Sequence, residues 1–182
     1  FGRYNLTVNV TPTDDHPNLA DFPLATQLDL GATFDPLTFT ASATDTGDIE
    51  INTDDDVFRF VAPAGGTATV TVTTPDSGLA GNVLVYDSAQ NLLGTGVASN
   101  GTATVTVNIA ANQQYYVRVD VGTTGAGQPD DIGTYTITVN TAPVDDYANQ
   151  GQFGAGNVGV ITLNNGTGFG TLSGFIVPNT DT

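Results

Sequence analysis

The sequence contains no cysteine, methionine, tryptophan or lysine, and its basic residues are three arginines and one histidine. Without cysteine there is neither a disulfide framework nor a thiolate metal site. The acidic residues number 19, all Asp except Glu50, which gives a formal net charge of −16. A surface this negative repels phosphate backbones and anionic lipids, so we expect no nucleic-acid partner. It attracts cations instead, and the short Asp carboxylate suits hard metal ions.

Long apolar runs are also missing. No stretch approaches the roughly 18 consecutive apolar residues of a membrane-spanning helix, so we expect no membrane insertion. No signal peptide is visible, and we expect Phe1 to be an internal position of a longer chain. The absence of easily oxidised cysteine and methionine is typical of a protein exposed outside the cell.

Apolar residues seldom recur at helical spacing, whereas strict alternation with Thr or Asn is frequent, as in half-covered strands. The alternating segments are 4–10, 67–73, 102–108 and 135–140, with further strands expected near 37–41, 47–51, 56–61, 82–86 and 114–121. Turn residues separate them at 63–66, 75–78, 100–101 and 122–127. Short strands at this spacing predict an all-β protein, an antiparallel β-sandwich of jelly-roll or immunoglobulin-like architecture.

An internal repeat divides the chain. Residues 2–9 recur as 133–140, and the motif around Asp14 recurs around Asp145, an offset of 131 residues. A weaker echo pairs 47–54 with 174–181. We therefore predict three parts: residues 1–11 as the last strand of a preceding repeat, 12–142 as a complete sandwich with an acidic linker, and 143–182 as the first part of a following repeat.

Two interpretations explain these incomplete ends. In the first, the chain is a piece of a longer protein, and its partners are neighbouring repeats. In the second, other copies of the chain complete the ends by strand exchange, which would assemble them head to tail. Residues 143–182 lack the middle strands of a repeat, and one strand from 1–10 could not supply them all, which favours the first interpretation.

The order of motifs between residues 45 and 140 resembles the bacterial pre-peptidase C-terminal domain family. The motifs are Asp54-Asp55-Asp56-Val57-Phe58, the turn 63–66, the segment 83–93, Tyr115-Tyr116-Val117-Arg118-Val119 and Gly133-Thr134-Tyr135. One departure is Gln90, where the family usually has Gly in a turn. The resemblance implies a compact antiparallel sandwich in a secreted or surface protein of a prokaryote. It also implies a non-catalytic accessory module. Some members of the family bind polymers, others bind calcium, and many have no assigned ligand.

Clustered carboxylates and amides make a calcium site the main candidate, because calcium takes six to eight oxygen ligands. The repeated Asp-Asp-x-x-Asn motif and the Asp-x-Asp at the start of a strand supply them; Asp54 and Asp56, two residues apart, share one side of that strand. The candidate ligands are Asp14, Asp15, Asn18, Asp54 and Asp56, with Asp145, Asp146, Asn149 and Asp181 in the next copy. Related repeats carry a similar Asp-Asp segment, which suggests calcium at the linker. The alternative is that Asp14 and Asp15 cap a turn and that Asp54, Asp55 and Asp56 form a solvated corner of the fold. Asp130-Asp131 is better explained as a plain turn.

Catalytic interpretations lack the residues that they need. His16 is the sole histidine, and it lies beside Pro17 in a turn, so neither a serine triad nor a zinc site is supported. The Asp54–Asp56 pair lacks the apolar cleft of a glycosidase acid, and the Gly-rich loop 122–127 lacks the Lys of a phosphate loop. We therefore expect a protein that is not an enzyme.

The remaining candidates concern packing and modification. Phe58 and Phe60 are expected in the core, and Arg59 and Arg118 in surface ion pairs. The tyrosines at 86, 115, 116 and 135 are expected to pack, although an exposed set could stack on sugars. Asn5, Asn100 and Asn165 each begin a glycosylation sequon.

The sequence thus predicts a structural repeat of an extracellular surface, stalk or fibre protein with calcium-stabilised linkers. The alternative is a polymer-binding module, for carbohydrate or protein, of a secreted hydrolase.

Overall fold

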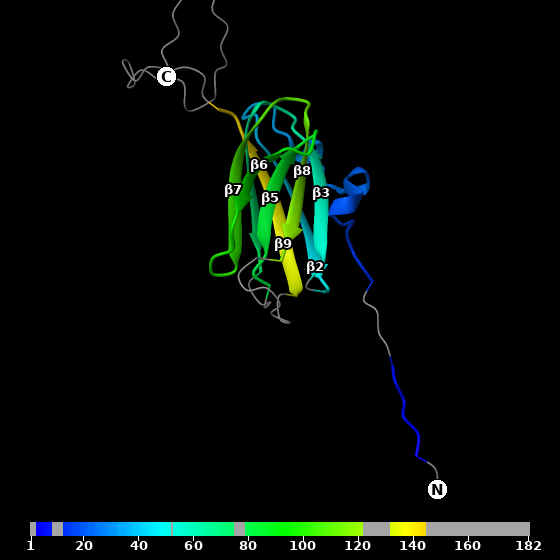
Figure 1. Cartoon of the computed structure of the whole chain (residues 1–182). Helices are drawn as coiled ribbons and strands as arrows, with labels where there is room; N and C mark the ends of the chain where they lie inside the picture. Colours follow the sequence, from blue (N-terminus) through cyan, green and yellow to red (C-terminus); the bar gives the residue numbers. More distant parts are fainter. Residues whose placement is uncertain (1–2, 9–12, 52, 75–78, 122–131, 145–182) are drawn as a thin grey trace, which may run out of the picture.

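The computed structural model describes residues 3–8, 13–51, 53–74, 79–121 and 132–144. These residues form two β-sheets packed face to face (Figure 1). The first sheet has the order β1 (Thr26–Gln27), β3 (Asp55–Val61), β8 (Gln114–Asp120), β5 (Asn82–Asp87), β6 (Leu92–Gly96). The second has the order β2 (Ala41–Ile49), β9 (Gly133–Ala142), β4 (Gly66–Thr73), β7 (Thr102–Ile109). All pairings are antiparallel except β1 with β3, so the predicted antiparallel sandwich is confirmed.

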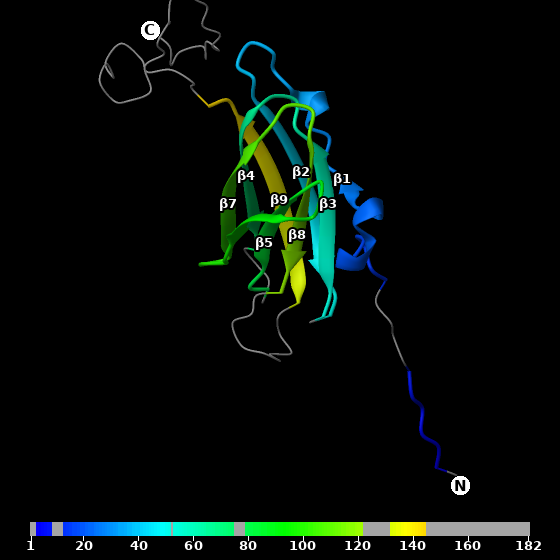
Figure 2. The ribbon, with the colours of Figure 1, turned by 45° about the horizontal axis from the view of Figure 1, so that its top comes forward.

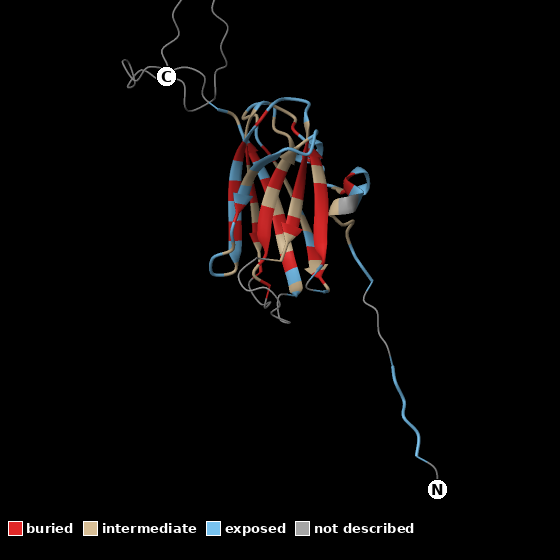
Figure 3. Cartoon of the chain, in the orientation of Figure 1, coloured by how far each residue is buried: buried red, intermediate tan, exposed pale blue. Residues whose placement is uncertain are grey.

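The core lies between the sheets because apolar residues alternate along each strand. Along β7, exposed threonines alternate with buried Ala103, Val105, Val107 and Ile109. The strands β4 and β9 of the same sheet alternate in the same way, whereas β3 is buried along most of its length (Figure 3). Phe58 and Phe60 are fully buried between the sheets, as expected.

A segment before the second sheet covers the outer side of the first. The 3₁₀ helix η1 (Leu19–Leu24) lies beside β3 in both orientations (Figures 1 and 2). Phe22 and Ala25 pack there against Val57 and Tyr116 in a second, smaller apolar cluster. A further 3₁₀ helix, η2 (Gly31–Thr33), leads to β2. No helix in the described ranges is long and apolar enough to span a membrane.

The strand predictions need correction at four places. The segment expected as a strand near 37–41 is mostly a turn. The segment expected near 47–51 overlaps the end of β2, which pairs with β9 along its whole length. Residues 35–40 form the turn, where Asp35 N–H donates to the Thr40 carbonyl over 2.9 Å. The strand β6 was not predicted because Leu92 and Leu93 are both exposed and do not alternate. The two-residue β1 is too short to leave a periodic signal.

The N-terminal segment 3–8 is exposed and forms no strand. Its apolar residues Tyr4, Leu6 and Val8 correspond in the repeat to Tyr135, Ile137 and Val139 of β9, which are buried. Its assignment to a preceding repeat stays a prediction, as does the repeat period. The second-copy ligands Asp145, Asp146, Asn149 and Asp181 lie outside the described residues.

Candidate metal centre

The acidic site lies where β2 ends and where β3 and β9 begin, with the linker 13–18 crossing beside them. Asp54 and Asp56 are 7% and 0% exposed. Asp55, between them, points to the other side of β3, where its Oδ2 lies 2.6 Å from Nε of Arg118. Side chains alternate along a strand, so Asp54 and Asp56 lie on one side, in the site, and Asp55 lies on the other side, in an ion pair. The sequence predicted that Asp54 and Asp56 share a side.

Hydrogen bonds hold the linker against β3. The Val57 N–H donates to the Pro17 carbonyl over 2.8 Å, and the Leu19 N–H donates to Asp55 Oδ1 over 2.7 Å. Asn18 connects the two parts, because its amide nitrogen donates to Asp14 Oδ2 (2.8 Å) while its oxygen accepts from the Asp55 N–H (3.2 Å). The linker is thus positioned by side chains that the sequence motif itself provides.

This docking brings together acids that lie 40 residues apart in the sequence. Carboxylate oxygens of Asp14, Asp54 and Asp56 all lie within 4.8 Å of one another. A second group, Asp14, Asp15 and Glu50, meets the same criterion and shares Asp14 with the first. The predicted linker motif and the predicted strand motif are therefore parts of one cluster.

Asp56 is the most confined member. Tyr135 of β9 donates its hydroxyl to Asp56 Oδ2 over 2.5 Å, whereas the buried Oδ1 has no hydrogen-bond partner. A buried carboxylate oxygen without a donor is costly unless a cation neutralises it. Gly47 makes room for this arrangement, since a Cβ there would overlap the Tyr135 hydroxyl.

Burial, and after it the neighbouring acids, raises the pKa of Asp56, Glu50 and Asp14. Burial, followed by the charges of Asp15, Asp54 and Glu50, raises the pKa of Asp56 to about 8, although the Tyr135 hydroxyl opposes the shift. Burial and the neighbouring Asp54 raise the pKa of Glu50 to about 7. The pKa of Asp14 is raised in the same direction, first by burial and then by Asp54. A bound divalent cation would reverse these shifts, because it stabilises the ionised forms.

The single histidine is not available as a ligand. Its Nδ1 lies 2.9 Å from the Thr26 hydroxyl, and its Nε2 lies 2.9 Å from the Thr46 carbonyl, to which it donates. Both ring nitrogens are therefore engaged within the protein. The donor set of the cluster is all oxygen, which suits Ca²⁺ or Mg²⁺ rather than zinc.

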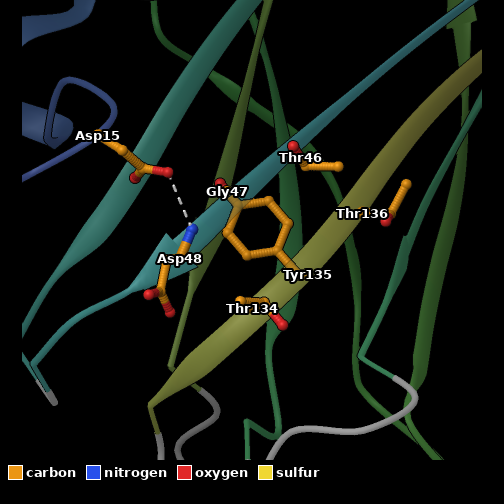
Figure 4. Close-up of a pocket in the computed structure, with 7 residues that line it drawn as sticks. All are labelled: Asp15, Thr46, Gly47, Asp48, Thr134, Tyr135 and Thr136. Carbon is orange, nitrogen blue, oxygen red and sulfur yellow. Dashed lines mark hydrogen bonds between the residues drawn. The ribbon is translucent and has the colours of Figure 1, made fainter.

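An open depression of about 450 Å³ adjoins the cluster (Figure 4). The Tyr135 ring, Gly47 and Thr46 line it together with Asp15, whose carboxylate accepts a hydrogen bond from the Asp48 N–H over 3.1 Å. Asp15 thus lies at the solvent side of the site, and water or a ligand could reach the cluster from this side.

The sequence named most members of this acidic cluster but not all of them. It missed Glu50, whose spacing matched no motif, and the role of Tyr135, whose partner Asp56 lies 79 residues away and in the other sheet. It named Asn18 as a candidate ligand, which stays a prediction; in the structure Asn18 ties the linker to β3. Arg118 forms ion pairs with Asp55 and Asp120, but no salt bridge joins Arg59 to another described residue.

The tyrosines mostly pack, as the sequence predicted. Tyr115, Tyr116 and Tyr135 are buried, and Tyr86 is half-buried beside Phe22. They do not form an exposed stacking surface for sugars. The Asn5 and Asn100 side chains are exposed, and their glycosylation stays a prediction.

No protein-family model matches the chain, and neither does any curated protein. Among solved structures, the chain is similar to the pre-peptidase C-terminal domain of a collagenase from Bacillus anthracis, at 20% identity and a TM-score of 0.46, covering 63% of this chain and 93% of that one. It is also similar to PliG, a periplasmic lysozyme inhibitor from Aeromonas hydrophila (16% identity, TM-score 0.41, covering 63% and 95%).

A third similar structure is the C-terminal carbohydrate-binding module CBM6 of LamC from Zobellia galactanivorans (14% identity, TM-score 0.34, covering 63% and 96%). The β-sandwich assignment rests on the strand order and register of the chain itself, and a pre-peptidase C-terminal domain is among the structures that it resembles.

Proposed function

We propose that this chain is a non-catalytic structural module of an extracellular or cell-surface protein, in which calcium fixes the linker to the sandwich that follows it. One observation carries the proposal: carboxylate oxygens of Asp14, in the linker, and of Asp54 and Asp56, at the start of β3, lie within 4.8 Å of one another. The buried Oδ1 of Asp56 among them has no hydrogen-bond donor. A cation there would hold the linker and the sandwich as one unit.

The position of the site explains why a repeat protein would use it. A linker held only by hydrogen bonds at its exposed residues frays easily, because water competes for each bond. An ion shared between the linker and two buried carboxylates makes detachment cost the binding free energy of the ion as well. In the next copy, Asp145, Asp146, Asn149 and Asp181 would form the corresponding site. A row of such modules would therefore stiffen when calcium binds.

The polymer-binding alternative has less support, because the tyrosines on which it depended are packed. The depression beside Asp15 is the remaining place where a sugar could bind. Retention of the chain on insoluble polysaccharide, with loss of retention on filling this depression by Thr136→Trp, would favour that alternative.

The proposal is tested by thermal melting in calcium and in EDTA. We expect EDTA to lower the melting temperature and to increase amide exchange and proteolysis in residues 13–18. Asp14→Ala should reproduce the effect of EDTA and should remove most of the response to calcium. Asp21→Ala, at an exposed position of η1, is the control and should respond as the wild type does. Melting curves that are the same in calcium and in EDTA would contradict the proposal.

A further inference from the structure

Most outward side chains of the second sheet are threonines. The outward positions of β2, β9, β4 and β7 form a surface that we call the threonine face: Ser42, Thr44, Thr46, Asp48, Thr67, Thr69, Thr71, Thr73, Thr102, Thr104, Thr106, Asn108, Thr134, Thr136, Thr138 and Asn140. All of these residues are exposed or half-buried. Most inward neighbours on the same strands belong to the core, although Asp45 of β2 is a half-buried acid.

The strand register aligns these threonines in rows across the sheet. Thr44 pairs with Thr138, Thr138 with Thr71, and Thr71 with Thr104. The next row is Thr46, Thr136, Thr73 and Thr102. Because strands lie about 4.8 Å apart and outward residues recur every two positions, these two rows form a regular grid of identical side chains.

The hydroxyls within the grid are partly satisfied by one another. Hydroxyl oxygens lie 2.9 Å apart between Thr69 and Thr106, 3.2 Å between Thr44 and Thr138, and 3.3 Å between Thr71 and Thr104. Threonine is also stiff at χ1, so ordering it on contact costs little entropy. The face therefore offers rigid methyl groups and hydroxyls that need few new hydrogen bonds.

Charge makes this face unlike the rest of the molecule. The chain carries a net charge of −16, yet the sole charged residue among the threonine-face positions is Asp48, at the corner where Asp15 of the linker also lies. The outer side of the first sheet, by comparison, carries Arg118, Asp55 and Asp120 and is partly covered by η1. Two copies of the chain repel each other at most surfaces. The threonine face is where they can approach without that penalty.

We propose that the threonine face is an interface between two copies of this module, packed sheet against sheet. Rows of threonine side chains set at the spacing of the strands can pack against a second set of rows with the same spacing. A second copy of the chain presents such a set. Four strands of about eight residues cover roughly 500 Å² on each partner. The total of about 1,000 Å² is at the lower limit for a specific interface, so a single pair associates weakly.

Linked modules would associate far more strongly, because each contact raises the local concentration for the next. Long chains of modules would then align side by side. This inference does not depend on the metal centre, which lies at one end of the sandwich and involves Asp14, Asp54 and Asp56.

Sedimentation equilibrium of the whole chain in saline buffer, at protein concentrations up to about 1 mM, detects association with dissociation constants as weak as about 1 mM. We expect reversible dimers for the wild type and monomers for Thr71→Asp/Thr138→Asp, which puts two charges at the centre of the face. Thr71→Val/Thr138→Val should retain the dimer. The control is Ser88→Asp, in the exposed turn after β5, and melting curves check that each variant folds.

Single cysteines give a second measurement that does not depend on the charged variant folding, because the chain has no cysteine of its own. We expect Thr71→Cys to cross-link between copies with a short bis-maleimide at least tenfold faster than Ser88→Cys. Equal cross-linking rates, or a monomer at every concentration, would overturn the proposal. So would binding to an insoluble polysaccharide that the Asp variant abolishes, since the face would then belong to that polymer.

Discussion

Asp56 is the residue on which the account of the metal centre depends most. Its carboxylate is fully buried, it has one hydrogen-bonded and one unpartnered oxygen, and four other acids surround it. Asp56→Asn keeps an oxygen that accepts from Tyr135 but removes the buried charge. We expect this variant, at pH 8 in EDTA, to melt at a higher temperature than the wild type.

The same variant should lose the calcium response. Titration calorimetry should show at least tenfold weaker calcium binding for Asp56→Asn, since it removes a charged ligand. Asp21→Asn, which removes one exposed charge from η1, controls for net charge and should bind calcium as the wild type does. If Asp56→Asn bound calcium with wild-type affinity, Asp56 would not be a ligand.

Gly47 tests the packing that positions Asp56. A methyl group at this position would overlap the Tyr135 hydroxyl, so Gly47→Ala has to displace the ring from Asp56. Overpacking of this kind costs about 1–3 kcal/mol of unfolding free energy. At Gly65 an added Cβ would make only ordinary contacts, the nearest at 3.7 Å, so Gly65→Ala is the matched control. Chemical denaturation measures both, and equal small effects would contradict the packing argument.

At the scale of single residues, the sequence predicted which side chains face inward but not which ones meet. Alternation placed Phe58 and Phe60 in the core and put Asp54 and Asp56 on one side of a strand, as observed. It contained no information on the distance between Asp14 and Asp56, because that depends on how the linker docks on β3. Glu50 lies in a loop with no period, so no pattern could assign it.

At the scale of elements, the turn between β5 and β6 is a further test. Gln90 adopts a φ of 65°, in the left-handed region where glycine is free of the Cβ penalty. The family that the motifs resemble usually has Gly there, which the turn geometry explains. We expect Gln90→Gly to raise the unfolding free energy by about 1 kcal/mol. Gln90→Ala retains the Cβ and should give no gain in the same denaturation experiment; a destabilised Gln90→Gly would contradict this.

The strands themselves were predictable where one face is buried and the other polar. Residues 67–73, 102–108 and 135–140 match β4, β7 and β9 within a few residues because their pattern alternates strictly. The strand β6 lacks that pattern because its leucines are exposed. The pairing of β9 between β2 and β4 joins residues that are 63 to 100 positions apart, and no local signal encodes it.

At the scale of the whole molecule, the raised pKa values predict how stability depends on pH. In metal-free protein, Asp56 and Glu50 hold protons to about pH 8 and about pH 7, whereas in the unfolded chain they release them near pH 4. Between about pH 4 and pH 8 the folded protein therefore binds more protons than the unfolded chain. The stability that these two groups contribute is greatest below about pH 4, and it is lost as the pH rises through 7 and 8.

We expect the melting temperature in EDTA to fall between about pH 5 and 8.5, and to fall less in saturating calcium, because the ion replaces the protons. Asp56→Asn should flatten the decline in EDTA, while Asp21→Asn should not. Differential scanning calorimetry at fixed ionic strength measures this. A melting temperature in EDTA that rises over the interval would show that the acids are not crowded in solution.

The most direct test of the account is a crystal structure of the chain grown in calcium, with an anomalous difference map to identify the ion. The account predicts one calcium peak between the linker and β3, with oxygens of Asp14, Asp54 and Asp56 at about 2.3–2.6 Å from it. A map without a peak there, in which Asp14 turns away from Asp54 and Asp56 into solvent, would contradict it.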